Sequence, residues 1–168
     1  MAEKKTLWRW FWAWDFEKEE RWLNEMAMQG WMLVEVGFCR YTFEKGEPGS
    51  YIYRLQMHKP EEDYLSFMED IGAEYVDRFV NWLYLRRSAE LGPFEIFSDA
   101  KSRLEHLEWI GRIMLVVGMC NLLIGVVNAL NGQPIGALNM LVGTLLMYGL
   151  GRIRGKAEEI RRDQELHE

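Results

Sequence analysis

The sequence has 168 residues, of which 49% are apolar and 27% are charged, and its formal net charge is −6 at pH 7. This length predicts about one domain, and the acidic balance provides no overall attraction for nucleic acid. Two distant cysteines, Cys39 and Cys120, imply no disulfide framework, and no His/Cys spacing indicates a zinc site. The first residues do not have the pattern of a secretory signal peptide.

The chain begins with an aromatic stretch, Leu7 to Trp14, which favours a first strand. Because strand side chains alternate between faces, Trp8, Trp10, Trp12 and Trp14 would share one face of it. The simplest interpretation places them in the core under helices. The alternative is an open aromatic surface that stacks a ligand, a partner or the membrane interface.

The predicted elements that follow alternate helices and strands. They are a helix capped by Asp15 and ending at Gly30, a strand from Trp31 to Phe43, a turn at 44–49, a strand from Tyr51 to His58, a helix from Pro60 to Gly72 and a strand from Glu74 to Arg87. The two middle strands would pair as a hairpin. This order, βαββαβ, predicts an α+β, ferredoxin-like cytosolic domain over residues 1–97, in which Phe94 to Phe97 adds an edge strand or a packing segment.

Strand alternation also groups arginines on the other face of this sheet. If the hairpin register is even, Arg40 opposes Arg54, with Arg9 and Arg86 on neighbouring strands. Two opposed arginines repel unless an anion or carboxylate lies between them, which hints at an anion-binding face. The plainer interpretation is that these are surface arginines, each paired with a nearby Glu.

None of the 46 charged residues lies between Ile113 and Gly151. A juxtamembrane helix at 98–112, capped by Ser98 or Asp99, would lead into this uncharged segment. The segment predicts a transmembrane helical hairpin with spans at 113–130 and 135–151, which are slightly short for a hydrocarbon core of about 30 Å. Basic residues flank both outer ends, so both termini, including the charged tail 152–168, are expected in the cytosol.

The two spans repeat the pattern Gly-x-x-Asn-x-x-x-Gly. Small residues allow helices to approach closely in lipid, and amides can hydrogen-bond across the contact. Three interpretations remain open: packing of the hairpin on itself, homo-oligomerisation, or an Asn-lined pore. The residues concerned are Gly111, Gly118, Asn121, Gly125, Asn128, Gly136, Asn139 and Gly143.

The predicted cytosolic domain also contains a longer sequence signature. It runs from Phe11, Trp14 and Asp15 through Glu20-x-Trp22-Leu23-Asn24-Glu25-Met26-Ala27-x-x-Gly30-Trp31 to Tyr41-x-Phe43-Glu44-x-Gly46-Glu47-Pro48-Gly49 and Tyr51-x-Tyr53-Arg54. Over roughly residues 7 to 100 this string resembles a bacterial family, the domain of unknown function 2812. The resemblance implies a membrane-associated bacterial protein, often encoded beside a PadR-type transcriptional regulator. It brings no catalytic residues.

No nucleophile elbow, phosphate loop or dinucleotide-binding glycine pattern is present in the sequence. We therefore expect a non-enzymatic protein of the bacterial inner membrane, without cofactor or metal and without direct nucleic-acid binding. Its cytosolic domain would bind a partner or ligand in a regulatory or sensory role, and its hairpin would contact lipid and form homo-oligomers. The alternative is a small homo-oligomeric channel or transport accessory subunit.

Overall fold

The computed structural model describes residues 3–58, 61–96 and 100–165. The chain divides into two compact units, with the boundary between Ile96 and Phe97.

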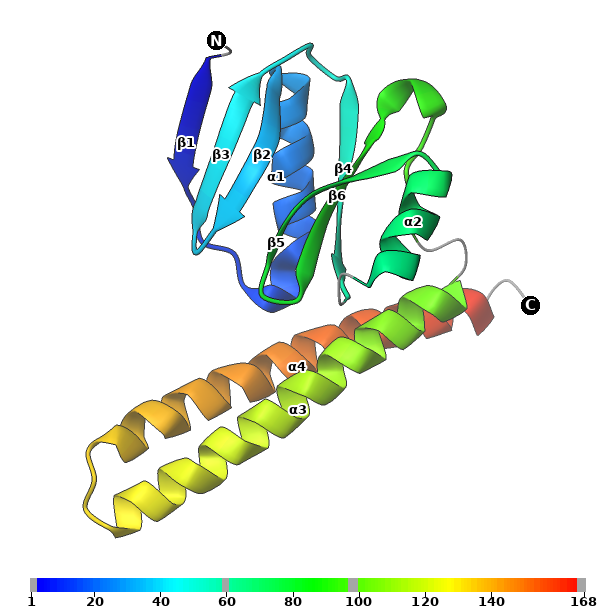
Figure 1. The fold of residues 1–168 in the computed structure, drawn as a ribbon. Helices are drawn as coiled ribbons and strands as arrows, with labels where there is room; N and C mark the ends of the chain where they lie inside the picture. Colours follow the sequence, from blue (N-terminus) through cyan, green and yellow to red (C-terminus); the bar gives the residue numbers. More distant parts are fainter. Residues whose placement is uncertain (1–2, 59–60, 97–99, 166–168) are drawn as a thin grey trace. The chain divides into compact units, whose positions relative to one another are not determined.

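The N-terminal unit contains two consecutive copies of one βαββ motif (Figure 1). The first copy comprises β1 (Lys4–Trp8), a 3₁₀ turn at Ala13–Asp15, α1 (Phe16–Met28), β2 (Trp31–Gly37) and β3 (Arg40–Lys45). The second copy comprises β4 (Tyr51–Met57), α2 (Glu62–Asp70), β5 (Ala73–Phe79) and β6 (Trp82–Ser88), followed by a 3₁₀ turn at Ala89–Leu91. Each copy folds into its own antiparallel sheet, with strand orders β1-β3-β2 and β4-β6-β5.

The two copies also match in detail. Both helices end at a glycine with positive φ, Gly30 at 81° and Gly72 at 77°, directly before the next strand. Such a conformation favours glycine because a side chain would be strained there. Each hairpin has a register shift at the same place, between Leu33 and Glu35 in β2 and between Tyr75 and Asp77 in β5. These correspondences indicate an internal repeat.

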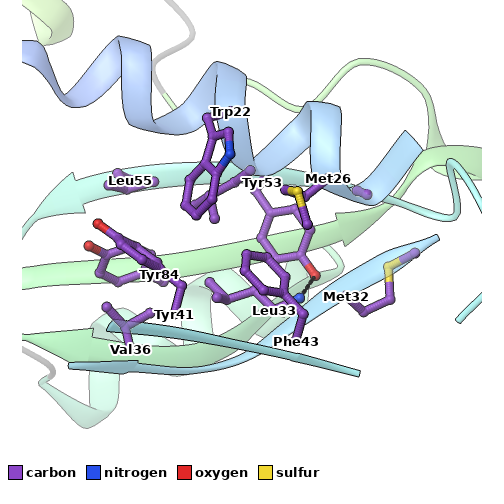
Figure 2. Close-up of a cluster of buried hydrophobic side chains, with 12 residues drawn as sticks. Trp22, Met26, Met32, Leu33, Val36, Tyr41, Phe43, Tyr53, Leu55 and Tyr84 are labelled. Atoms are coloured by element: carbon purple, nitrogen blue, oxygen red, sulfur yellow. Dashed lines mark hydrogen bonds between the residues drawn. The ribbon is translucent and has the colours of Figure 1, made fainter. Parts of the chain in front are cut away.

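Helix α1 provides the centre of the larger core, which draws on both sheets (Figure 2). Its apolar side chains recur at helical spacing and face the core, whereas α2 covers a smaller cluster. Within the larger core the Leu33 N–H donates to the Tyr53 hydroxyl at 2.9 Å. The larger cluster consists of Trp22, Leu23, Met26, Ala27, Met32, Leu33, Val36, Tyr41, Phe43, Tyr53, Leu55 and Tyr84.

Helix α1 also supplies hydrogen bonds to strand β4 through its polar side chains. The Asn24 amide accepts from the Tyr53 N–H at 2.8 Å and donates to the Tyr53 carbonyl at 3.1 Å. Glu20 accepts from the Leu55 N–H at 2.8 Å. An edge strand leaves such backbone groups unpaired, so α1 satisfies this edge of β4 much as a neighbouring strand would.

The α+β class is as predicted, but the strand order differs from the predicted ferredoxin-like βαββαβ. Each of the long strands predicted at 31–43 and 74–87 is a hairpin, so the described part of this unit has six strands in two sheets. The predicted pairing of the 31–43 and 51–58 segments is also wrong, because β3 pairs with β1 and β2 while β4 pairs with β6.

Several local predictions near the ends of elements change as well. The first strand is Lys4–Trp8 and stops well before Trp14. Asp15 occupies the N-cap position of α1, yet its carboxylate makes no cap hydrogen bond and pairs with Lys18 at 3.0 Å. Phe94 is fully buried in a packing segment without a strand. The predicted cap at Ser98 or Asp99 lies outside the described residues.

The C-terminal unit is a hairpin of two long helices, α3 (Ala100–Leu130) and α4 (Ile135–Glu165), joined by a turn containing Gly132. Both helices are long and apolar enough to cross a membrane, and little of their apolar stretches is buried. Leu123 is 61% exposed and Leu130 is 83% exposed, for example. Helix α3 continues without a break from the predicted juxtamembrane segment into the predicted first span, and α4 extends through most of the predicted tail.

Candidate functional site

The four arginines of the predicted anion site are not brought together. Arg40 lies in the first sheet, opposite Trp8 and Gly37, whereas Arg54 lies in the second sheet, opposite Leu85. Arg86 is opposite Tyr53, the neighbour of Arg54, so Arg54 and Arg86 are on opposite faces of their sheet. The predicted opposition of Arg40 and Arg54 is therefore wrong, because it assumed a hairpin between two strands that belong to different sheets.

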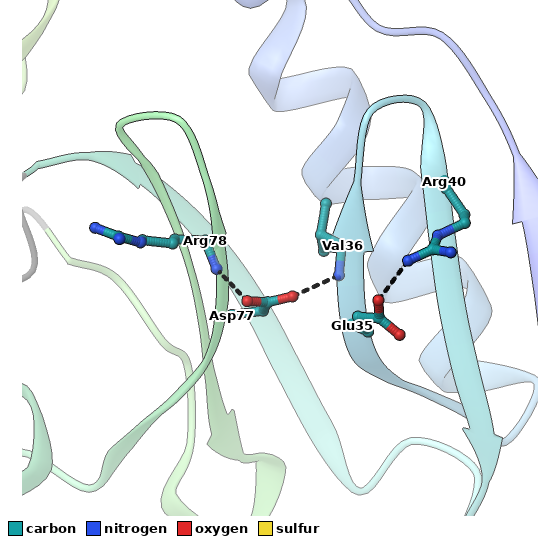
Figure 3. A network of polar contacts seen from close by, with 5 residues as sticks. All are labelled: Glu35, Val36, Arg40, Asp77 and Arg78. Atoms are coloured by element: carbon teal, nitrogen blue, oxygen red, sulfur yellow. Dashed lines mark hydrogen bonds and ion pairs between the residues drawn. The ribbon is translucent and has the colours of Figure 1, made fainter.

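All four of these arginines also have local partners. The Arg54 guanidinium donates to the Tyr53 carbonyl at 3.0 Å. Arg40 pairs with Glu35 at 2.5 Å, as Figure 3 shows, and Arg86 pairs with Glu74 at 2.7 Å. The Arg9 guanidinium lies over the Trp22 ring, 5.0 Å from its centroid. This arrangement matches the plainer interpretation for Arg40 and Arg86, namely surface arginines paired with a nearby Glu.

The β2–β3 and β5–β6 hairpins of the two repeats lie side by side in Figure 3, linked by Asp77. One Asp77 carboxylate oxygen accepts from the Val36 N–H at 2.7 Å, and the other accepts from the Arg78 N–H at 2.8 Å. Glu35 occupies the corresponding position in the first repeat but turns to Arg40. Asp77 therefore holds the facing edges of the two sheets together and has a structural role.

Three of the four N-terminal tryptophans are on the surface. Trp8 is 73% exposed, Trp10 53% and Trp12 39%, whereas only Trp14 is buried. The core interpretation fails for the first three because the strand ends at Trp8, so the alternation that would place them under the helices does not continue.

Two of these exposed rings, Trp10 and Trp12, form a connected cluster with Phe38 of the β2–β3 turn, which is 66% exposed. Trp10 makes edge-to-face contacts with Trp12 and Phe38, at centroid distances of 5.2 and 5.7 Å. Trp12 in turn stacks on buried Trp14 at 4.8 Å, which fixes the cluster to the core. We call Trp10, Trp12 and Phe38 the tryptophan surface. Exposed aromatic patches of this kind mark sites of interaction.

A buried carboxylate, which the sequence analysis did not single out, lies in the larger core. One oxygen of Glu19 accepts from the hydroxyls of Tyr41, at 2.7 Å, and Tyr84, at 2.5 Å. Burial raises the pKa of Glu19 above its ordinary value, and it also raises the pKa of both tyrosines. Its place at the i−3 position from Trp22, on the apolar face of α1, was the available sequence signal. The site joins α1 to both sheets.

In the C-terminal unit, the glycines of the repeated pattern lie in the contact between α3 and α4. A Cβ on Gly143 would lie 3.0 Å from the Gly118 carbonyl oxygen, and a Cβ on Gly111 would lie 3.3 Å from Leu150 Cδ1. Gly125 and Gly136 are equally close to the opposite helix. These glycines therefore lie where α3 packs against α4 within one hairpin.

The three asparagines of the pattern, Asn121, Asn128 and Asn139, are partly exposed beside this contact. The Asn121 amide donates to the Val117 carbonyl of its own helix at 2.9 Å. Among the described residues, no group of three or more His, Cys, Asp or Glu side chains is placed to hold a metal ion.

These features define a class of protein: an α+β domain of two βαββ repeats, joined to a hairpin of two helices that could cross a membrane. A family profile described as a protein of unknown function (DUF2812) matches residues 15–119, from the start of α1 into α3. The chain belongs to this family, which confirms the resemblance drawn from the sequence. Comparison with curated proteins and with solved structures gave no match.

Proposed function

We propose that this chain is a non-enzymatic integral membrane protein whose hairpin anchors a cytosolic, partner-binding domain. The observation that supports this proposal most directly is the hairpin, because α3 and α4 expose apolar side chains over a stretch with no charged residue. In water such a surface is costly, whereas in a bilayer it contacts lipid tails. Because basic residues flank both outer ends, the connecting turn would face away from the cytosol. The resemblance drawn from the sequence suggests that the membrane is the bacterial inner membrane.

The tryptophan surface is the partner-binding site in this proposal. Tryptophan is enriched among the residues that contribute most to binding at protein interfaces. Trp12 of this surface is fixed by stacking on buried Trp14, and Trp10 packs against Trp12 and Phe38. Fixed rings lose little conformational freedom on binding. The resemblance drawn from the sequence suggests a PadR-type transcriptional regulator as the partner, so that the protein would tether or regulate it at the membrane.

Site-specific photocrosslinking of the full-length protein in membranes of its host tests this assignment. A photoreactive phenylalanine analogue at Phe38 should crosslink to a PadR-type regulator, and Trp10→Ser should abolish this product. The matched control is the same analogue at Phe67, an exposed aromatic position on α2. Crosslinks from Phe38 to lipid alone, or to a second copy of the chain, would contradict the assignment.

Homo-oligomerisation through the hairpin remains part of the proposal. The glycines face the partner helix of the same chain, so an oligomer would use the opposite, apolar faces. Replacing exposed Leu123 by Trp should then lower the mass of the complex in gentle detergent. If the unsubstituted protein already has the mass of a monomer, and the substitution leaves that mass unchanged, the oligomer is contradicted. The channel alternative would use Asn121, Asn128 and Asn139, of which Asn121 donates one N–H to the Val117 carbonyl of its own helix.

A further inference from the structure

A groove runs between α3 and α4 beside the charged end of the hairpin. Its cavity volume is about 390 Å³, and it is partly open to the surroundings. The residues that line it come from both helices and lie on either side of the boundary between the uncharged segment and its charged flanks.

The part of the groove on the membrane side is lined by apolar side chains, which an acyl chain could contact. Leu115 and Leu150 line it on the membrane side of the boundary. Gly111 and Ala157 also line the groove, and α3 and α4 approach closely there, since a Cβ on Gly111 would lie 3.3 Å from Leu150 Cδ1. An acyl chain lying along the groove would cover Leu115, which is only partly buried within the hairpin.

The charged part contains two arginines that face the same space from different helices. Arg112 on α3 and Arg154 on α4 both line the groove, and neither has an ion pair or hydrogen bond within the described ranges. Arg161, farther from the uncharged segment, is already paired with Glu108 at 2.5 Å. Glu158 also lines the groove, four residues after Arg154. Two unpaired guanidinium groups on one groove favour an anion between them, and phosphate oxygens suit their fork of donors.

We propose that this groove binds one anionic phospholipid of the cytoplasmic leaflet, with its phosphate between Arg112 and Arg154 and an acyl chain along Leu115 and Leu150. Basic pockets between transmembrane helices on the cytoplasmic side recognise anionic headgroups in this way. The proposal rests on the membrane insertion proposed above. It adds a specific ligand class and a binding site that the hairpin alone does not require.

Native mass spectrometry of the full-length protein, released from nanodiscs of mixed phosphatidylglycerol and phosphatidylcholine, tests the proposal. We expect one phosphatidylglycerol to be retained in preference to phosphatidylcholine. The double variant Arg112→Gln/Arg154→Gln should reduce this retention at least tenfold. Arg152→Gln is the matched control, because Arg152 is an exposed arginine on the same helix that does not line the groove.

Equal retention of both lipids, or retention that the double variant leaves unchanged, would overturn the proposal. If inorganic phosphate at millimolar concentration saturates the groove, and its binding depends on Arg112 and Arg154 in the same way, the ligand is a free anion and the lipid assignment is overturned. In each case the hairpin would still be found in the membrane. If the chain does not enter nanodiscs at all, the proposed function fails with it.

Discussion

Gly125 of α3 and Gly136 of α4 face each other so closely that neither position has room for a side chain. A Cβ on Gly136 would lie 2.8 Å from the Gly125 carbonyl oxygen, and a Cβ on Gly125 would lie 3.1 Å from the Gly136 carbonyl oxygen. Close approach of two backbones allows dispersion contacts between helices, which matter in lipid because burial there provides no hydrophobic gain. The hairpin is therefore packed through its glycines.

Replacing Gly136 by Val should force the two helices apart. The clash is with backbone atoms, which cannot turn aside as a flexible side chain can, and overpacking of this kind costs about 1–3 kcal/mol. Spin labels at exposed Val127 and Leu138, in a background without Cys39 and Cys120, report the interhelical distance by electron paramagnetic resonance. The distance should increase or its distribution broaden. Gly151→Val is the control, since a Cβ at Gly151 would contact nothing within 4 Å.

The stability of tryptophan variants should separate the surface from the core. Trp8→Thr should change the free energy of unfolding by no more than about 0.5 kcal/mol, because this ring is exposed and threonine suits a strand. Trp22→Ala should cost about 3–5 kcal/mol, because it empties a site at the centre of the larger core. Urea unfolding of the full-length protein in detergent measures both. Similar losses for the two variants would mean that Trp8 is covered in solution.

Asn24 should be required for docking α1 against β4. Asn24→Ala leaves the N–H and the carbonyl of Tyr53 without this partner, and unsatisfied buried groups cost about 1–3 kcal/mol each. We expect a total loss of about 2–4 kcal/mol in the free energy of unfolding. Glu25→Ala, at the adjacent exposed position of the same helix, serves as the control and should be nearly neutral. If Asn24→Ala lowers the free energy of unfolding no more than the control does, water replaces the Asn24 amide as the partner of the Tyr53 backbone.

Glu19 should make the stability of the N-terminal domain depend on pH. Its pKa in the folded chain lies above its ordinary value of 4.5, chiefly because burial disfavours the carboxylate. The folded state therefore holds the proton more tightly than the unfolded state, and this contribution to stability decreases as pH rises from about 4.5 through the folded pKa.

Removing one of the hydroxyl groups that donate to Glu19 should make the stability of the domain depend more strongly on pH. Tyr84→Phe should cost about 1.5–3 kcal/mol at pH 7, where the carboxylate needs the donor, and less at pH 5, where more of Glu19 is protonated. Tyr53→Phe is the matched control, because the Tyr53 hydroxyl accepts from the Leu33 backbone N–H, which does not titrate, so its loss should not vary with pH. A loss for Tyr84→Phe that is equal at both pH values would contradict a titrating Glu19.

The sequence predicted the helices well because their signals are strong. Apolar spacing and the terminal glycines Gly30 and Gly72 marked α1 and α2, and the absence of charge marked the hairpin. The hairpins within 31–43 and 74–87 were missed because their turns lack the usual Asn-Gly or Asp-Gly signal. In the structure Cys39 and Val80 adopt positive φ values of 56°, a conformation that such residues rarely take. Without a visible turn, each stretch reads as one long strand.

The errors in the candidate sites followed from strands that were predicted too long. The predicted opposition of Arg40 and Arg54 depended on the wrong strand pairing, and the buried tryptophan face depended on a strand that stops at Trp8. The internal repeat was visible, since Leu23, Met26 and Gly30 recur as Leu65, Met68 and Gly72, and it would have indicated two equivalent βαββ units. The groove between α3 and α4 needs the register of two helices, which spacing along one helix does not provide.

Cysteine accessibility in intact cells tests the central claim, a membrane hairpin with both ends in the cytosol, most directly. In a background with Cys39 and Cys120 replaced by Ser, a single cysteine is placed at Gln133 in the turn or at exposed Glu159 on α4. A membrane-impermeant maleimide should label Gln133→Cys in intact cells and Glu159→Cys only after permeabilisation. Labelling of both positions only after permeabilisation, with the protein in the soluble fraction, would contradict the account.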